Sequence, residues 1–401
     1  MTHIEQMIQD LCPNGVEFKT LGEVLDYEQP TPYIVKNTDY DESYSMPVLT
    51  AGQSFILGYT NEKEGIYKAS KEQPTIIFDD FTTSFHWVDF DFKVKSSAMK
   101  MLRPKNDANI NFRFVFYAMQ CIKFQATEHT RYWISKYSQF EIPLPPLEIQ
   151  KKIVECLDKF SALAAELQAE LQMRRKQYEY YRTQLLTPHS DCNSVTKPDD
   201  CNWEWKTLGE IAKYRRGSFP QPYGRSEWYD GEGAMPFVQV ADVEEIGMCL
   251  KQETKQRISK LAMPKSVFVP KGTVIVTLQG SIGKVAVTQY DSYVDRTLGI
   301  FESYQTDINK KYFAYQLERV FSIKREKARG GTIKTITKEE FTDFSIPIPS
   351  LTEQERIVSI LDKFEALTTS LSDGIPAEQA AQQKRYEYYR DLLLTFDRKA
   401  V

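Results

Sequence analysis

The sequence has few features that would predict a membrane protein, a disulfide-rich protein or a metalloprotein. No stretch approaches the roughly 20 apolar residues that a transmembrane helix needs, and the polar start MTHIEQMIQDL does not predict a secretion signal. The cysteines are scattered without a C-x-x-C pair, and the 4 histidines lack metal-ligand spacing. We therefore expect a cytoplasmic protein without disulfides and without a metal site. The cysteines are Cys12, Cys121, Cys156, Cys192, Cys201 and Cys249.

A strong charge of one sign is also missing, since 51 basic residues stand against 55 acidic ones. Between residues 19 and 139 the balance is 14 Lys and Arg against 15 Asp and Glu, a net charge of −1. Between residues 206 and 343 it is 22 against 17, a net charge of +5. The second block is mildly basic, but charge alone does not predict nucleic-acid binding.

Common motifs for binding nucleotides and cofactors are absent. No Gly-x-Gly-x-x-Gly loop occurs, and GSIGK at 280–284 is followed by Val285, which breaks the phosphate-loop pattern. This segment instead favours a strand–turn–strand with a glycine-rich tip. The Asn/Asp-Pro-Pro-aromatic segment with which methyltransferases hold a flipped adenine is missing too. We therefore expect no methyl transfer by this chain itself.

One acidic pattern keeps an enzymatic alternative open. Asp79, Asp80, Asp91 and Lys93 have the carboxylate-and-lysine composition of metal-dependent nucleases. Acidic pairs near a lysine are common, and no helix with a suitable glutamate supports the pattern. The alternative interpretation is a stand-alone metal-dependent nuclease with a coiled-coil dimerisation rod.

What the sequence does contain is a duplication. Three phrases occur twice in the same order: FKTLGEV (18–24) and WKTLGEI (205–211), FEIPLPPLEIQKKIVECLDKFSAL (140–163) and FSIPIPSLTEQERIVSILDKFEAL (344–367), and KQYEYYRTQLL (176–186) and KRYEYYRDLLL (384–394). Between these phrases lie two heads, at about 19–139 and 206–343, which share almost nothing else. The pattern predicts one repeated frame that carries two different heads.

The repeated frame predicts long helices. Prolines precede each helix, and Thr352 followed by Glu355 predicts a capping box at the start of the second. Apolar residues then follow at alternating steps of three and four, which is typical of a coiled coil. Seam positions are Ile153, Leu157, Phe160, Leu167, Leu171, Tyr178 and Tyr181 in the first helix and Ile357, Leu361, Phe364, Tyr386 and Tyr389 in the second. Gly374 and Pro376 predict a break near 374–376.

The repeated tyrosines have two interpretations. Tyr180 and Tyr388 fall beside the predicted seam, not on it. Tyrosine suits a surface that is packed on one side and wet on the other. Either the tyrosines serve only the coiled-coil core, or those beside the seam dock a partner protein.

Taken together, these phrases resemble the specificity (S) subunit of type I restriction–modification systems. The resemblance covers essentially the whole chain and is closest to the type IC subfamily. In the first head MPVLTAGQSFILGYTNE (46–62) and FDDFTTSFHWVDFDFKVKSSAMKML (78–102) resemble one class of target recognition domain. In the second head GSIGKVAV (280–287) and GGTIKTITKEEF (330–341) resemble another class.

The resemblance implies an α+β architecture with a pseudo-twofold internal repeat. Two globular α/β target recognition domains are separated by two long helices that form an antiparallel coiled coil. The expected boundaries are 1–141 for the first recognition domain, 142–190 for the first helical region, 191–345 for the second recognition domain and 346–401 for the second helical region.

The resemblance also implies a function without catalysis by this chain. Each head reads one half of a bipartite double-stranded DNA target, and the helical rod sets the unread spacer. Two methyltransferase (modification) subunits bind the chain and methylate adenine, and two restriction subunits can join as a translocase and nuclease. S-adenosylmethionine, ATP and Mg²⁺ are expected on those partners, and no membrane is involved.

Candidate DNA contacts follow from residue chemistry, since lysine and serine suit phosphates and Gln53 can pair with a base edge. An arginine beside a glycine, as in Arg216–Gly217 and Arg329–Gly330, suits a loop that enters a groove. The candidates in the first head are Thr50, Gln53, Tyr59, Thr60, Lys93, Lys95, Ser96, Ser97 and Lys100. Those in the second head are Arg215, Arg216, Arg225, Gln239, Gln279, Ser281, Arg329 and Lys334. A tandem AELQ at 165–172 suggests in addition that helix length tunes the spacer, since four residues add about 6 Å.

Overall fold

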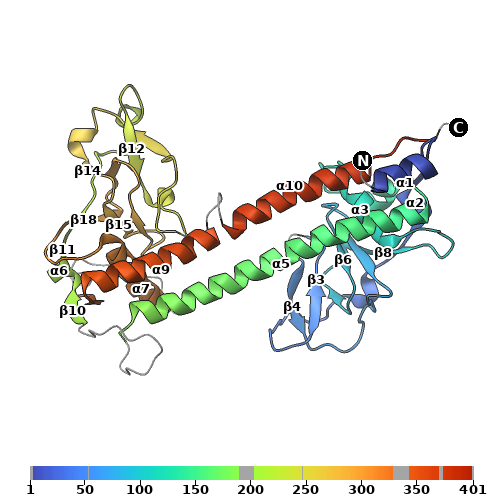
Figure 1. Cartoon of the computed structure of the whole chain (residues 1–401), viewed down its shortest axis with the longest axis horizontal. Helices are drawn as coiled ribbons and strands as arrows, with labels where there is room; N and C mark the ends of the chain where they lie inside the picture. Colours follow the sequence, from blue (N-terminus) through green and yellow to red (C-terminus); the bar gives the residue numbers. More distant parts are fainter. Residues whose placement is uncertain are drawn as a thin grey trace. The chain divides into compact units, whose positions relative to one another are not determined.

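The computed structural model of the chain describes residues 3–52, 54–188, 203–245, 247–327, 343–369 and 374–399. Its contacts divide the chain into two compact units (Figure 1). Unit 1 comprises Met1–Glu166 and Ala380–Val401, and unit 2 comprises Leu167–Gln379. Each unit therefore holds one head, the beginning of one frame helix and the end of the other.

Three long helices build the frame. Helix α5 spans Leu147–Leu186, α9 spans Leu351–Thr369 and α10 spans Ile375–Leu393. The division between the units falls within α5. Separate helices α9 and α10 stand where the sequence predicted a break, and residues 370–373 between them lie outside the described residues.

Equivalent side chains begin α5 and α9. Gln150 Nε2 donates to the carbonyl of Pro145 at 2.8 Å, and Gln354 Nε2 donates to that of Pro349 at 2.8 Å. The predicted capping box at Thr352 is wrong, because α9 begins at Leu351 and Thr352 therefore lies inside its first turn. Ser350 precedes the helix instead, and its Oγ accepts from the Glu353 amide at 3.4 Å.

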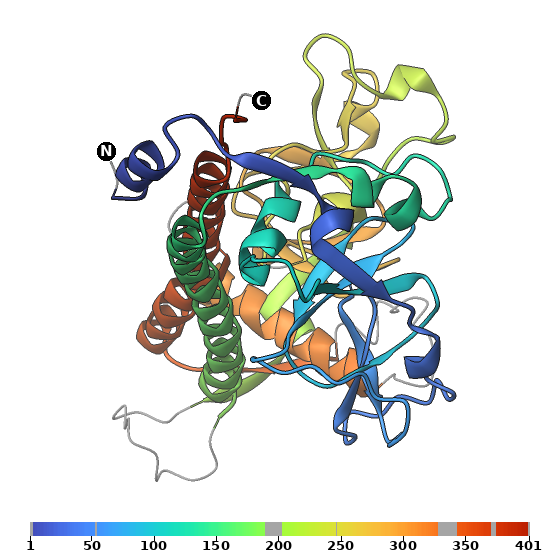
Figure 2. The same ribbon diagram turned by 90° about the vertical axis from the view of Figure 1, so that its right-hand side faces the viewer.

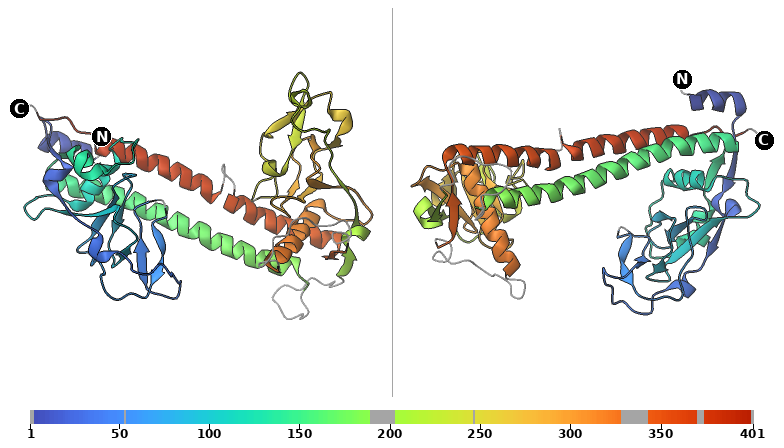
Figure 3. Two further views of the ribbon diagram at one scale, coloured as in Figure 1. Left: turned by 180° about the vertical axis from the view of Figure 1, so that it is seen from behind. Right: turned by 60° about the horizontal axis from the view of Figure 1, so that its bottom comes forward.

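Within each unit the frame helices pair antiparallel (Figure 3). In unit 1 Phe160 stacks on Tyr389 with ring centroids 5.4 Å apart. In unit 2 Tyr181 stacks on Phe364 at 5.7 Å. Further along, Leu167 and Leu171 form a small buried cluster with Ile375. These contacts confirm the predicted seam. The tyrosine phrase of each repeat packs on the seam phenylalanine of the other repeat.

Other seam residues pack on the heads as well. Ile153 and Leu157 are fully buried in a core that includes residues of α3 (Phe112–Gln120). Figure 2 shows α3 beside the first half of α5. Ile357 and Leu361 are buried in the same way in the core that includes α7 (Lys310–Lys327). The start of each frame helix is therefore part of a head's core.

The first head is built from a four-stranded antiparallel sheet in the order β2-β8-β5-β6 and a three-stranded sheet in the order β4-β3-β7. In the smaller sheet β3 and β7 run parallel. The strands are β1 Glu17–Thr20, β2 Leu25–Glu28, β3 Met46–Leu49, β4 Ile56–Thr60, β5 Thr75–Asp79, β6 Phe85–Val88, β7 Lys93–Val94, β8 Met99–Pro104 and β9 Glu141–Leu144, and the remaining helices are α1 His3–Leu11, α2 Leu21–Val24 and α4 Tyr132–Ser135.

The second head repeats this topology, although its sequence does not. Its larger sheet has the order β11-β18-β15-β16, and its smaller sheet has the order β13-β12-β17-β14 with β12 and β17 parallel. Within the described residues, the smaller sheet of the second head adds β14 to this arrangement. The elements are β10 Glu204–Thr207, α6 Leu208–Ile211, β11 Ala212–Arg216, β12 Met235–Val238, β13 Gln256–Ile258, β14 Val267–Val269, β15 Val274–Thr277, β16 Val285–Val287, β17 Ser292–Val294, β18 Leu298–Tyr304 and β19 Ser345–Ile348.

The end of the described chain closes unit 1. Leu393 and Leu394 are buried in the core of the first head. The amide of Val16 donates to the carbonyl of Asp397 at 2.9 Å, and the amide of Lys399 donates to that of Val16 at 3.0 Å. The first head is therefore completed by residues from the far end of the sequence.

Candidate nucleic-acid interface

Three loops of the second head meet at one place. They follow β12, β15 and β17, and the carboxyl ends of the parallel strands β12 and β17 lie at the same sheet edge. The amide of Asp295 after β17 donates to the carbonyl of Val238 in β12 at 3.0 Å. The amide of Leu278 after β15 donates to the carbonyl of Thr297 at 2.9 Å. Backbone bonds thus hold the three loops together, and we name this surface the loop face.

The first head has an equivalent loop face after β3, β5 and β7. The amide of Lys95 donates to the carbonyl of Leu49 at 3.1 Å, and that of Asp80 donates to Ala98 at 2.7 Å. Ser84 Oγ joins the remaining pair of loops by donating to the carbonyl of Ala51 at 2.6 Å. The same scaffold therefore presents different side chains in the two heads.

Several residues predicted in the first head do reach this face. Lys95, Ser96 and Ser97 are exposed in the loop after β7, and the Lys95 ammonium lies 5.7 Å from the centre of the Tyr40 ring. Thr50 is half-buried in the loop after β3. Tyr59 is half-buried on β4, away from the three loops, and Gln53 lies outside the described residues.

Three other predictions for the first head are corrected by burial. Lys93 and Lys100 are each only 1% exposed, and Thr60 is 3% exposed. Lys93 Nζ lies 2.9 Å from Glu62, and Lys100 Nζ lies 3.3 Å from Asp80. These ammonium groups neutralise carboxylates inside the head, so neither is exposed for contact with a phosphate.

The acidic pattern behind the nuclease alternative is used by the fold. Asp79 accepts from the amides of Phe81 and Thr82, and so closes the turn after β5. Asp80 is 1% exposed beside Lys100. Asp91 pairs with Lys68 at 2.5 Å. Among the residues that the structure describes, no three His, Cys, Asp or Glu side chains are grouped to hold a metal ion. Nothing in the geometry supports the nuclease alternative.

The candidates in the second head divide into three groups. Gln239, Gln279 and Ser281 lie on the loop face, and GSIGK forms the predicted turn between the antiparallel strands β15 and β16. Arg215 pairs with Glu302 at 3.2 Å, and Arg225 pairs with Glu227 at 3.0 Å. Arg216 is exposed at the end of β11. Arg329 and Lys334 lie outside the described residues.

A glycine brings the end of β11 close to the loop face. A Cβ on Gly217 would lie 2.2 Å from the carbonyl oxygen of Val294 and 2.4 Å from that of Asp295. No side chain fits there, so the glycine after Arg216 permits the close approach of two backbones. The sequence predicted that Arg216 and Gly217 belong to a loop that enters a groove. In the structure Gly217 is instead needed where its backbone packs closely against that of Val294 and Asp295.

Sequence reasoning missed three cationic or aromatic residues near these loops. His129 stacks on Phe81 of the first loop face, with ring centroids 4.5 Å apart. The Arg131 guanidinium lies 5.9 Å from the same ring. In the second head the Arg296 guanidinium lies 5.1 Å from the Tyr223 ring. A signal for Arg296 was present, because a basic residue stands two positions after the end of β17, but the adjoining Asp295 cancelled its charge.

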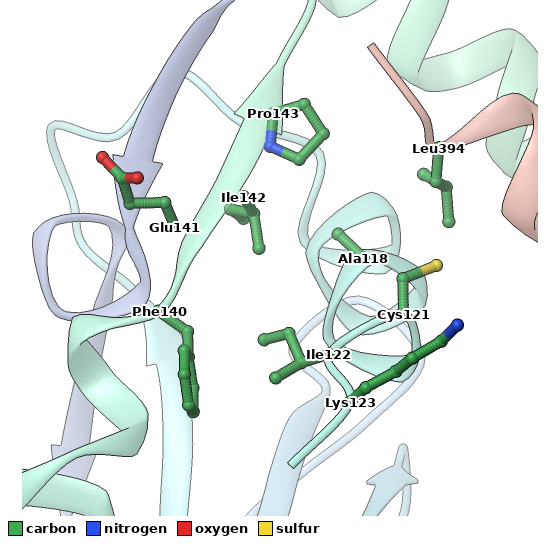
Figure 4. Close-up of a pocket in the computed structure, with 9 residues that line it drawn as sticks. All are labelled: Ala118, Cys121, Ile122, Lys123, Phe140, Glu141, Ile142, Pro143 and Leu394. Atoms are coloured by element: carbon green, nitrogen blue, oxygen red, sulfur yellow. The ribbon is translucent and has the colours of Figure 1, made fainter. Parts of the chain in front are cut away.

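Away from the loop faces, unit 1 contains an open pocket of about 330 Å³ (Figure 4). Ala118 of α3 and Cys121, which directly follows this helix, line it together with Leu394. In unit 2 the corresponding positions hold Gln316 and Arg319, and Gln316 Nε2 donates to the carbonyl of Leu186 at 2.9 Å. The second unit thus fills with its own side chains the space that the first leaves open.

Among the described residues, no helix is both long and apolar enough to cross a membrane. Comparison with known families matches residues 13–173 and 201–379 to the "type I restriction modification DNA specificity domain". The chain is 41% identical to the type I restriction enzyme EcoR124I/EcoR124II specificity subunit of Escherichia coli over 99% of this chain and 97% of that protein.

Solved structures agree on the fold. An S subunit of a type I restriction–modification system from M. genitalium matches with a TM-score of 0.56 and 16% identity, covering 95% of this chain and 96% of that one. A chain solved in work on assembly and conformational transition of the type I R-M system matches with a TM-score of 0.58 and 20% identity, covering 95% and 98%.

Proposed function

Because the chain belongs to the family of type I restriction–modification DNA specificity domains, we propose that it is the subunit that chooses the DNA sequence on which its complex acts. Each head reads one half of a bipartite double-stranded target through its loop face. The observation that carries this proposal is the pair of loop faces, which share one backbone arrangement and differ in their side chains. Such a design suits two readers of different sequences.

The chain itself does not catalyse a reaction in this proposal. Methyl transfer to adenine and cleavage belong to partner subunits, which bring S-adenosylmethionine, ATP and Mg²⁺. Support comes from the sequence, which lacks the motifs for such chemistry. The nuclease pattern gives no further support to an enzyme, since its carboxylates serve turns and buried ion pairs. A cytoplasmic location stays a prediction.

Two modification subunits would dock on equivalent tyrosines. Tyr180 is 62% exposed in unit 2, and Tyr388 is 64% exposed in unit 1. Each lies edge-on to its neighbour on the seam, Tyr181 or Tyr389, with ring centroids 5.4 and 5.3 Å apart. The same exposed aromatic surface in both units suits two copies of one partner. In this proposal Tyr181 and Tyr389 pack in the seam, while the adjacent Tyr180 and Tyr388 dock the partner. Two restriction subunits can then join the assembly.

The middle of α5 would set the spacer between the half-sites. The tandem AELQ at 165–172 lies inside this uninterrupted helix, and the division between the units falls within it. One more copy would add about 6 Å and about 40° of helix rotation. A longer helix should therefore lengthen the unread gap without changing either half-site.

The test is to co-express the chain with its cognate modification subunit and to map methylated adenines by single-molecule sequencing. We expect a bipartite motif with a fixed gap, and the same half-sites with a longer gap after insertion of one AELQ. Methylation at a continuous site, or an unchanged gap in a stable insertion variant, would contradict the proposal. For the nuclease alternative, metal-dependent cleavage by the chain alone that is lost in Asp80→Asn would be required.

A further inference from the structure

Several hydrogen bonds fix the loop that carries Arg296. The preceding Asp295 is only 3% exposed. Its carboxylate accepts from the hydroxyl of Tyr223, and from the amide and Oγ1 of Thr297 at 3.2 and 2.6 Å. Its amide and its carbonyl bond Val238 and Leu298, each at 3.0 Å. The backbone on both sides of Arg296 is therefore fixed, while its own side chain is exposed.

The guanidinium of Arg296 is available for a ligand. It lies 5.1 Å from the centre of the Tyr223 ring, a contact that orients the planar group without neutralising it. Within the described part of the chain it makes no hydrogen bond or ion pair. Arg215 and Arg225 differ in this respect, since each is paired with a glutamate.

The surroundings of Arg296 suit a base edge. Gln239 and Gln279 lie on the two neighbouring loops of the same face. Arginine pairs through two hydrogen bonds with the O6 and N7 atoms of guanine, and glutamine pairs in a similar way with adenine. The second loop face therefore carries side chains that can read purines in the major groove.

The first head gives a useful contrast at the same loop. There the cation over a tyrosine is Lys95, which lies 5.7 Å from the Tyr40 ring centre. An ammonium is a point charge without a planar fork, so it suits a phosphate better than a base edge. Both loops thus place a cation over a tyrosine ring, but this cation is a lysine in the loop after β7 and an arginine in the loop after β17.

We propose that Arg296 is a specificity-determining residue that reads a guanine in the half-site of the second head, with Asp295 as its positioning residue. This inference rests on the proposed function, because it assumes that the loop face meets DNA. It adds the residue, the base and the geometry of recognition.

The experiment uses the full chain assembled with its modification subunits and duplexes that carry the mapped target. Each base pair of the second half-site is changed in turn, and affinity is measured at several salt concentrations. In the wild type one G·C pair should be preferred by about 5- to 150-fold. Arg296→Ala should abolish that preference alone, leaving the first half-site and the salt dependence unchanged.

Three further variants make the result specific. Arg296→Lys keeps the charge but loses the fork, so the preference should still fall. Lys95→Ala should weaken all sequences alike and reduce the salt slope by about 1. Lys271→Ala removes a charge from the opposite end of β15 and should change neither quantity. Equal thermal unfolding of wild type and Arg296→Ala would show that the loop is intact.

Two outcomes would overturn the inference while leaving the proposed function standing. One is a bipartite motif whose second half-site preferences persist in Arg296→Ala. The other is a uniform loss of affinity with a smaller salt slope, which would make Arg296 a phosphate contact. Absence of any bipartite motif in the wild type would instead contradict the proposed function itself.

Discussion

A tyrosine–aspartate contact ties each head to its frame helix, and its surroundings differ between the two units. In unit 1 Tyr117 Oη donates to Asp158 at 2.5 Å, with Ser161 at 3.2 Å. In unit 2 Tyr315 Oη lies 2.8 Å from Asp362 and 2.9 Å from Glu365. One hydroxyl proton cannot serve two carboxylates, so unit 2 brings two acidic groups to a place where unit 1 has one acidic group and a hydroxyl.

Other pairs of equivalent residues show how the duplication has diverged. The side chains of Asn111 and Asn309 each accept from backbone amides at the start of a helix. The backbone amide of each asparagine donates to the side-chain oxygen of a frame glutamine, Gln150 or Gln354. By contrast, Ala118 and Cys121 stand where unit 2 has Gln316 and Arg319. The contacts that begin helices have been kept, while the side chains between them have changed.

The largest effect is expected from truncating the equivalent core isoleucines. This change tests whether the starts of α5 and α9 contribute equally to stability. Ile153→Ala and Ile357→Ala each remove a fully buried side chain and should each cost about 2–5 kcal/mol of unfolding free energy. Hydrogen exchange should locate the loss in unit 1 for the first variant and in unit 2 for the second. Loss in the opposite unit would contradict the division of the cores.

A smaller effect should follow from Gly217→Ala, which acts on a feature of the second head alone. The new Cβ would meet the carbonyl oxygens of Val294 and Asp295, and the strain should cost about 1–3 kcal/mol. Gly224→Ala is the matched control, because nothing lies within 4 Å of its Cβ position. Urea unfolding measures both, and equal stability of the two variants would show that the close approach is dispensable.

A pH-dependent effect should distinguish unit 2 from unit 1. Burial raises the pKa of Glu365 above its ordinary value of 4.5, while Ser161 has the same place in unit 1. The folded state therefore holds the proton more tightly than the unfolded state. The stability that the protonated Glu365 carboxyl contributes is complete below the ordinary pKa. This stability is lost as pH rises through the raised pKa, by at most about 1.4 kcal/mol per pH unit.

Glu365→Gln should remove this dependence and make unit 2 more stable at neutral pH. Thermal unfolding of both proteins between pH 4 and 8, followed by hydrogen exchange in unit 2, would measure it. Glu355→Gln changes an exposed carboxylate of the same helix and serves as the control. Parallel pH profiles for the wild type and Glu365→Gln would rule out Glu365 as the titrating group.

The smallest effect concerns the open pocket. Ala118→Gln would place an amide where Gln316 lies in unit 2, within reach of the carbonyl of Leu394. One added hydrogen bond should raise stability by at most about 1 kcal/mol. Ala162→Gln, at an exposed position of α5, controls for helix propensity. A clear loss of stability would mean that the two pockets differ in shape and not only in filling.

Much of the frame could be predicted, because its phrases are written twice and its seam follows helical spacing. The shared topology of the heads could not, since equivalent strands such as β5 and β15 share an apolar character but no repeated phrase. Lys93 and Lys100 were misjudged for a related reason. Their partners Glu62 and Asp80 are distant in sequence, and a buried ion pair looks like surface charge until the strands are assembled. Arg296 was missed because the adjoining Asp295 cancels its charge in the sequence, so no basic stretch marks this position.

The closing of unit 1 by the far end of the chain has a consequence for protein synthesis. The first head emerges from the ribosome before residue 380 by about 200 residues, or roughly 10 to 40 s of translation. Unit 2 is complete as soon as residue 379 is made. The head that is synthesised first is thus finished last, and during that interval its core lacks Leu393 and Leu394. A stop codon placed directly after residue 379 would damage the first head and spare the second.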